Sequence, residues 1–212
     1  AGARESASVD VLSDVLRTVR LTGALFFPME VSSPWVDEIP HATEFASIVL
    51  PGAQHVVSYH IVTKGACWAS LEDGPAVGLE SGDMLVIGRG DRYIVWSAPH
   101  MRSDMPDESV LMFFRNMVSG LAPSIVIEGG RGPDRVEVVC GFLGCDIEPY
   151  NPVLQTLPRL VHVRKPRENA GPDRLSPLIA LAMLESRERR PGAKNVLLRL
   201  SEILFIEVVR RY

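Results

Sequence analysis

The stretch from His55 to Trp96 decides the fold and reads HVVSYHIVTKGACWASLEDGPAVGLESGDMLVIGRGDRYIVW. Apolar and polar residues alternate in short runs that are rich in valine, isoleucine, tyrosine and tryptophan. Glycine and aspartate interrupt these runs at Gly65, Asp73-Gly74, Gly82-Asp83 and residues 88–91. This pattern is typical of consecutive antiparallel strands that are joined by tight turns. We therefore predict that the stretch forms the centre of a small β-barrel.

The turns of this stretch resemble the second sequence motif of the cupin barrels. In that motif one glycine turn precedes a strand, and a second turn precedes a metal-binding histidine, whose place is taken here by Tyr93. The family's first motif would end at Gly65, which puts its acidic ligand on Ser58 and its histidines near residues 51–54. The resemblance implies the cupin fold. Because these positions hold no metal ligand, we expect neither a metal nor another cofactor.

The composition excludes several classes of protein. The 212 residues are 46% hydrophobic and 23% charged, and the net charge of -4 gives no basic footprint for nucleic acid. No apolar run approaches the roughly 20 residues that cross a bilayer, and the polar start lacks a secretory pattern. Three cysteines at irregular spacing argue against a disulfide framework. We expect a cytoplasmic protein that contacts no membrane.

We divide the chain into three parts. Residues 1–21 form an N-terminal arm with a short amphipathic helix over Val9–Arg20, because the apolar residues share one helical stripe. Residues 22–148 form the barrel. Its further strands are predicted at Ala24–Val31, Val110–Met117, Ser124–Glu128 and Arg135–Leu143, with an edge strand or loop near Pro34 and Pro40 and a polar loop over Ala98–Ser109.

Residues 149–212 form a helical segment. Helices are predicted over Asn151–Leu157, from Pro172 or Leu175 to Arg189, and over Ala193–Tyr212. In the simplest interpretation these helices cover the barrel. In the alternative, one face of the last helix forms a homodimer, since Phe205 and Ile206 widen its apolar arc.

Six blocks of the chain, taken in order, resemble the N-terminal sensor domain of AraC-type transcription regulators. They are DVLSDVLRTVRLTGALF, YHIVTKGACWASLE, LESGDMLVIGRGD, VVCGFLGCD, NPVLQTLPRLVHV and PGAKNVLLRLSEILFIEVVRRY. More narrowly, they resemble the cupin subgroup that includes regulators of the reactive-chlorine response. In that family a DNA-binding domain of two helix-turn-helix units follows the sensor. We expect that domain to be missing from this chain, so that DNA would be bound only through it.

The barrel interior is the predicted binding site for a small-molecule effector. A barrel of about eight strands has room for side chains or for one small ligand. If Ser58 points inward, alternation along its strand puts His60 inside as well. Candidate ligand contacts are His60, Trp68, Tyr93 and Trp96. The alternative for each of them is an ordinary role in core packing.

The cysteines offer a second mode of sensing. Cys67, Cys140 and Cys145 are candidate redox residues, and Cys140 lies in a block where the resembling subgroup also has a cysteine. A redox switch needs a thiolate, which a nearby cation stabilises. No cation neighbours Cys140 in the sequence, so the alternative is a cysteine that packs as a small hydrophobic residue.

These observations lead to one hypothesis and one alternative. The chain is expected to be the ligand- or oxidant-sensing and dimerisation domain of an AraC-type regulator, without catalytic activity. The alternative is a small-molecule cupin enzyme, an isomerase or a dioxygenase. It requires a metal or an acid and base pair, and Ser58 and Tyr93 at the ligand positions weigh against it.

Overall fold

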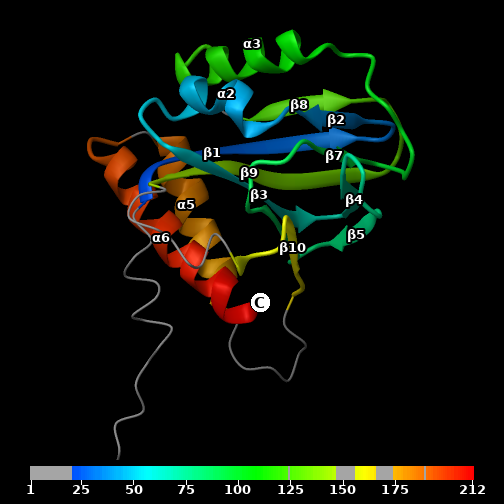
Figure 1. Cartoon of the computed structure of the whole chain (residues 1–212). Coiled ribbons are helices and arrows are strands. Elements are labelled where there is room, and N and C mark those ends of the chain that lie inside the picture. Colours follow the sequence, from blue (N-terminus) through cyan, green and yellow to red (C-terminus); the bar gives the residue numbers. More distant parts are fainter. Residues whose placement is uncertain (1–20, 124, 147–155, 166–173, 189) are drawn as a thin grey trace, which may run out of the picture.

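Two β-sheets pack face to face, and helices cover the outer face of the larger sheet and one end of the sandwich (Figure 1). The computed structural model describes residues 21–123, 125–146, 156–165, 174–188 and 190–212. The six-stranded sheet has the order β10 (Leu160–Val163), β6 (Met84–Ile87), β3 (His55–Lys64), β9 (Arg135–Cys145), β1 (Leu21–Ser32) and β8 (Val126–Gly129). The four-stranded sheet has the order β2 (Val36–Ile39), β7 (Tyr93–Trp96), β4 (Ala66–Leu71) and β5 (Val77–Glu80).

The molecule is therefore mainly β, as the sequence predicts. The predicted strand over Ala24–Val31 lies within β1 and that over Arg135–Leu143 lies within β9. The predicted strand over Ser124–Glu128 overlaps β8. The predicted helix over Val9–Arg20 falls outside the described residues, as does most of the one over Asn151–Leu157.

The central strand pair β3 and β9 is buried on both faces. On β9, Val138 and Cys140 belong to the core between the two sheets, whereas Val139 and Leu143 belong to a second core on the outer face of the six-stranded sheet. Side chains alternate between the two faces of a strand, so each of these strands contributes to both cores. This double burial explains why the central strands read as nearly continuous apolar runs.

Helices α5 (Leu175–Glu188) and α6 (Ala193–Arg211) form the second core with the outer face of the six-stranded sheet. Both helices were expected from the 3.6-residue spacing of their apolar positions. Leu200, Leu204 and Phe205 of α6 are buried in this core. Phe205 therefore packs inward, and Val196 and Ile203 are the large apolar residues that α6 exposes.

The predicted strand over Val110–Met117 is wrong, because this segment is part of helix α3 (Asp107–Val118). Val110, Phe113 or Phe114 and Met117 recur every three to four residues, which is the period of a helix and not of a strand. Phe114 is buried, and Asp107 and Glu108 supply negative charge at the helix N-terminus. The preceding polar loop accordingly ends at Pro106.

Two further elements differ from the expectations. Residues 149–212 were expected to form a helical segment, but Leu160–Val163 within it forms strand β10, which pairs antiparallel with β6. Helix α2 (Ala42–Val49) was not predicted. Its start is capped, because the Thr43 amide donates to Nδ1 of His41 at 3.3 Å and the His41 amide donates to the Glu44 carboxylate at 3.2 Å.

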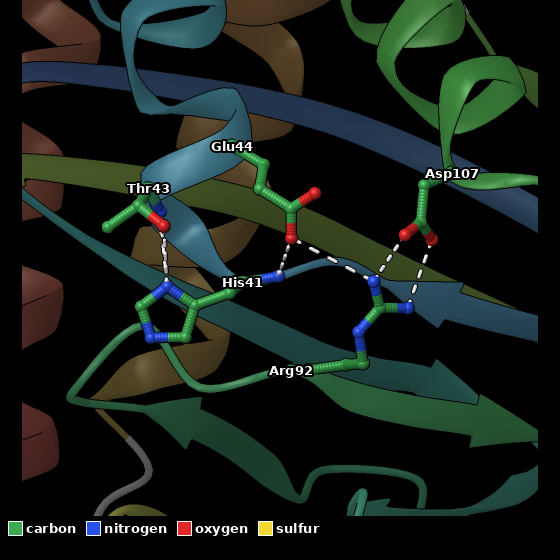
Figure 2. A network of polar contacts seen from close by, with 5 residues as sticks. All are labelled: His41, Thr43, Glu44, Arg92 and Asp107. Atoms are coloured by element: carbon green, nitrogen blue, oxygen red, sulfur yellow. Dashed lines mark hydrogen bonds and ion pairs between the residues drawn. The ribbon is translucent and has the colours of Figure 1, made fainter.

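Arg92, just before β7, joins the two helices that cover the end of the sandwich (Figure 2). Its guanidinium donates to both carboxylate oxygens of Asp107 in α3 and lies 3.8 Å from the Glu44 carboxylate of α2. The hydrogen bonds from Arg92 lower the pKa of Asp107. The N-terminus of α3 is thereby tied to the four-stranded sheet, and the helix lies above strands β8 and β2 (Figure 1).

Candidate functional site

A cavity of about 90 Å³ lies between the two sheets, beneath α3. Its walls come from both sheets, from α3 and from the loop before α3. Most of them are apolar, and five are phenylalanine or tryptophan: Phe27, Trp35, Phe113, Phe114 and Phe142. An apolar cavity with a few convergent polar groups is the usual form of a small-molecule site.

Three buried polar side chains meet on the inner wall of this cavity. His60 of β3 holds a central position, with Nε2 2.7 Å from the Tyr93 hydroxyl and Nδ1 3.1 Å from the Cys140 thiol. His60, Tyr93 and Cys140 are 7%, 1% and 3% exposed. β3, β7 and β9 therefore bring together three side chains that are far apart in the sequence.

Burial keeps this group of three neutral. Desolvation lowers the pKa of His60 to about 4, so the imidazole carries no charge at neutral pH. Burial also raises the pKa of Tyr93 and of Cys140. A neutral imidazole has one donor and one acceptor nitrogen, and both are occupied here by the hydroxyl and the thiol. The inner wall thus presents uncharged polar groups to the cavity.

Three carboxylates lie on the same lining. Asp37 and Glu38 come from β2, and Glu128 comes from β8. These strands are edges of their respective sheets and lie near each other below α3 (Figure 1). Burial and the charge of Glu128 raise the pKa of Asp37 to about 7. Burial likewise raises the pKa of Glu128.

The four candidate ligand contacts fall into two groups. His60 and Tyr93 line the cavity and touch each other. Trp68 and Trp96 do not line it. Trp68 is 39% exposed, because its neighbours Cys67 and Ala69 are the residues of β4 that point into the core. Trp96 pairs with Trp68 in the ladder and is buried.

The three cysteines are buried and do not meet one another in a disulfide. Only Cys140 lines the cavity. Cys67 packs in the core between the sheets, and Cys145 packs on the other face of the six-stranded sheet. Burial raises the pKa of Cys67 and of Cys145 to about 12. These thiols are therefore poor sources of thiolate.

Two positions that carry metal ligands in the similar cupin motifs hold a serine and a tyrosine in this chain. Ser58 is 1% exposed in β3, and Tyr93 donates to or accepts from His60. Among the residues that the structure describes, no group of three His, Cys, Asp or Glu side chains is arranged to hold a metal ion. None of the described helices is long and apolar enough to span a membrane.

The chain belongs to the cupin family, whose model matches residues 10–212. Two curated relatives are transcription regulators of the helix-turn-helix type. AlkR of Acinetobacter baylyi is 23% identical over 95% of this chain and 60% of its own length. An uncharacterised regulator of Haemophilus influenzae is 21% identical over 95% of this chain and 59% of its own length. The chain thus spans about three fifths of these relatives.

A similar solved structure is that of apo ToxT from Vibrio cholerae. It is 9% identical to this chain, with a TM-score of 0.46, and the match covers 90% of this chain and 57% of that one. A second structure of ToxT, bound to an unsaturated fatty acid, is 8% identical, with a TM-score of 0.44. That match covers 90% of this chain and 56% of the other.

Several residues of the site were not among the candidates. The segment over residues 36–39 was predicted only as a loop or an edge strand, so the sequence did not indicate whether the Asp37 side chain points into the barrel. Glu128 ends a predicted strand, but nothing in the sequence joins it to Asp37, which lies in the other sheet. Phe113 was placed in a strand, and only the helical period of α3 could have indicated its inward face.

Proposed function

We propose that this chain is the effector-sensing domain of an AraC-type transcription regulator and that a small molecule binds between its two sheets. One observation carries the proposal: the neutral group of His60, Tyr93 and Cys140 lines an otherwise largely apolar cavity. Such a lining binds an apolar molecule and orients it through a few hydrogen bonds. The match of almost the whole chain to two longer regulators supports the same function.

The strands that line the cavity also contact the terminal helices, which suggests how binding is transmitted. His60 faces the cavity, while the adjacent Tyr59 faces the second core, against Leu204 and Phe205 of α6. If β3 can adopt two arrangements, a ligand that binds one of them more tightly increases the population of that arrangement. The contacts of Tyr59 with α6 would change with it. In this proposal the C-terminal helices form a homodimer, and DNA is contacted by a helix-turn-helix domain outside these 212 residues. Such a regulator works in the cytoplasm.

Oxidant sensing is the second form of the proposal, and it is the one that a reactive-chlorine regulator would need. Cys140 is its best residue, because it lines the cavity and lies 3.1 Å from an imidazole nitrogen. The imidazole is neutral, however, and burial raises the pKa of the thiol. Reaction with an oxidant requires thiolate. These facts favour reversible ligand binding over oxidation.

We propose binding rather than turnover for the same site. A general base needs a nitrogen or oxygen within reach of the substrate proton. Both nitrogens of His60 are engaged, one by the Tyr93 hydroxyl and one by the Cys140 thiol. The low pKa of His60, about 4, also makes it a weak base at neutral pH.

Native mass spectrometry of the purified chain, compared with its denatured mass, tests this function. We expect an organic adduct on the wild type and at least a tenfold loss of occupancy in His60→Ala, because His60 holds the Tyr93 hydroxyl and the Cys140 thiol in place on the cavity wall. Trp68→Ala is the discriminating variant, since its side chain lies outside the cavity. An adduct lost in Trp68→Ala but kept in His60→Ala contradicts the proposed site. One stoichiometric transition metal without an organic adduct would favour the enzyme.

A further inference from the structure

The charges on the cavity lining are of one sign. Asp37, Glu38 and Glu128 contribute three carboxylates, and neither a lysine nor an arginine lines the cavity among the described residues. His60 adds no positive charge, because its pKa is about 4. A ligand with a carboxylate or phosphate would therefore meet like charge without a counterion. The lining selects against anions.

Only one of the three carboxylates has a partner within the described part of the chain. Glu38 accepts a hydrogen bond from the Ser103 amide at 3.0 Å and lies 3.9 Å from Arg102. No basic side chain described in the structure lies within ion-pair distance of Asp37 or Glu128. Burial, and then the nearby charge of Glu128, raise the pKa of Asp37, and no described cation offsets them. A cation between the two would relieve their repulsion.

A second polar group in this part of the lining also lacks a partner. Trp35 precedes β2, lines the cavity and is 6% exposed. Its indole nitrogen is buried and finds no acceptor among the residues that the structure describes. A buried donor without an acceptor costs roughly 1–3 kcal/mol, so a bound molecule or water is expected beside it. The indole and phenyl rings of the wall also offer faces that attract cations.

From these observations we propose that the effector is a small organic cation, with its ammonium group between Asp37 and Glu128 and its apolar part among Phe27, Phe113 and Phe142. This inference rests on the proposed function and adds the chemical class of the ligand. The cavity of about 90 Å³ is smaller than the roughly 150 Å³ that accommodates benzene. A short-chain amine of about four heavy atoms matches that size.

Three probes of equal length separate charge from size: propylamine, 1-propanol and propanoate. Each is titrated into the isotope-labelled chain, and the amide resonances of cavity residues report binding by NMR. We expect propylamine to bind at least about tenfold more tightly than the alcohol, and propanoate to bind most weakly. The affinity for the amine should rise as pH increases through about 7, because Asp37 then loses its proton.

The variant Asp37→Asn/Glu128→Gln should reduce the preference for amine over alcohol to about one. The matched control is Asp73→Asn/Glu80→Gln, which removes the same charge from exposed positions outside the cavity. It should keep the preference. Equal binding of amine and alcohol to the wild type would overturn the cationic ligand and leave the cavity as a sensor site. If no probe shifts any cavity resonance, the proposed function fails together with this inference.

Discussion

Gly141 illustrates how tightly the two faces of the central sheet are coupled. It lies between Cys140 and Phe142, which line the cavity, but it faces Tyr59 on the opposite side. A β-carbon at Gly141 would overlap the hydroxyl and ring carbons of Tyr59. Tyr59 is buried, and its ring packs edge-on against that of Phe26 with 5.5 Å between the ring centroids, so a shift of the ring would disturb this contact.

We therefore expect Gly141→Ala to lower the free energy of unfolding by about 1–3 kcal/mol, as overpacked core positions do. Urea denaturation measures the change. The control is Gly78→Ala in β5, where the added carbon would lie 3.6 Å from the Trp68 ring, an ordinary contact. Unchanged stability in Gly141→Ala would mean that Tyr59 moves away without cost.

Single side chains differ in how well the sequence predicted them. Alternation along β3 placed His60 on the same face as Ser58, because a strand has a period of two, and the structure shows that this face lines the cavity. Its partners Tyr93 and Cys140 belong to other strands, and their contacts depend on how the sheets pack. Trp68 and Trp96 face each other in register, and neither lines the cavity.

Asp83, in the turn that precedes β6, adds side-chain contacts to strand β10 beyond its pairing with β6. The Asp83 carboxylate accepts hydrogen bonds from the amides of Lys165 at 2.8 Å and Glu80 at 3.1 Å, and it lies 2.8 Å from Nε2 of His162. Burial acts to raise the pKa of Asp83, but these hydrogen bonds outweigh it and lower the pKa. The deprotonated carboxylate is thus the form that the fold requires.

Asp83→Asn should lower the free energy of unfolding by about 1–3 kcal/mol at neutral pH, because a buried acceptor oxygen is lost. The folded-state pKa lies below the unfolded value, so the stabilisation is lost as pH falls below about 4. Chemical denaturation from pH 7 to pH 3 should therefore show the difference from wild type shrinking. Asp104→Asn, an exposed aspartate in the loop before α3, is the control. A difference that is independent of pH would contradict this role of the carboxylate.

The elements that were predicted wrongly are those whose sequence fits both a helix and a strand. The segment Val110–Met117 is short and apolar, and such runs fit a strand or a helix until their contacts are known. In the structure Phe114 packs into the core while Met112 is exposed, which only a helix achieves at this spacing. Leu160–Val163 follows Pro158. It becomes a strand because it pairs with β6, which lies some 75 positions earlier in the chain, and a local pattern does not reveal such a partner.

The assembly proposed for the whole molecule depends on the exposed face of the last two helices. Val196 and Ile203 are 41% and 44% exposed on α6, seven residues apart and therefore on one face. Leu181 and Leu184 of α5 are also exposed. Apolar groups of this kind on a surface often mark a contact between chains.

If this face forms the homodimer, Ile203→Glu should convert the dimer to a monomer at micromolar concentration, because a carboxylate would be buried in the interface. Size-exclusion chromatography with light scattering measures the mass. The control is Leu121→Glu, at a 77% exposed position after α3, which should leave the mass unchanged. A wild-type monomer, or a dimer that persists in Ile203→Glu, would exclude this face.

Local pattern was enough to predict the fold class, the strands β1 and β9, the helices α5 and α6, and the shared face of Ser58 and His60. These features depend on period and turn chemistry, which are encoded within a few residues. Packing alone decided that α3 covers the cavity, that Phe205 turns inward, and that Asp37 and Glu128 share one lining. Such contacts join strands of different sheets, and their geometry follows from how the sheets twist and stack, which no local pattern specifies.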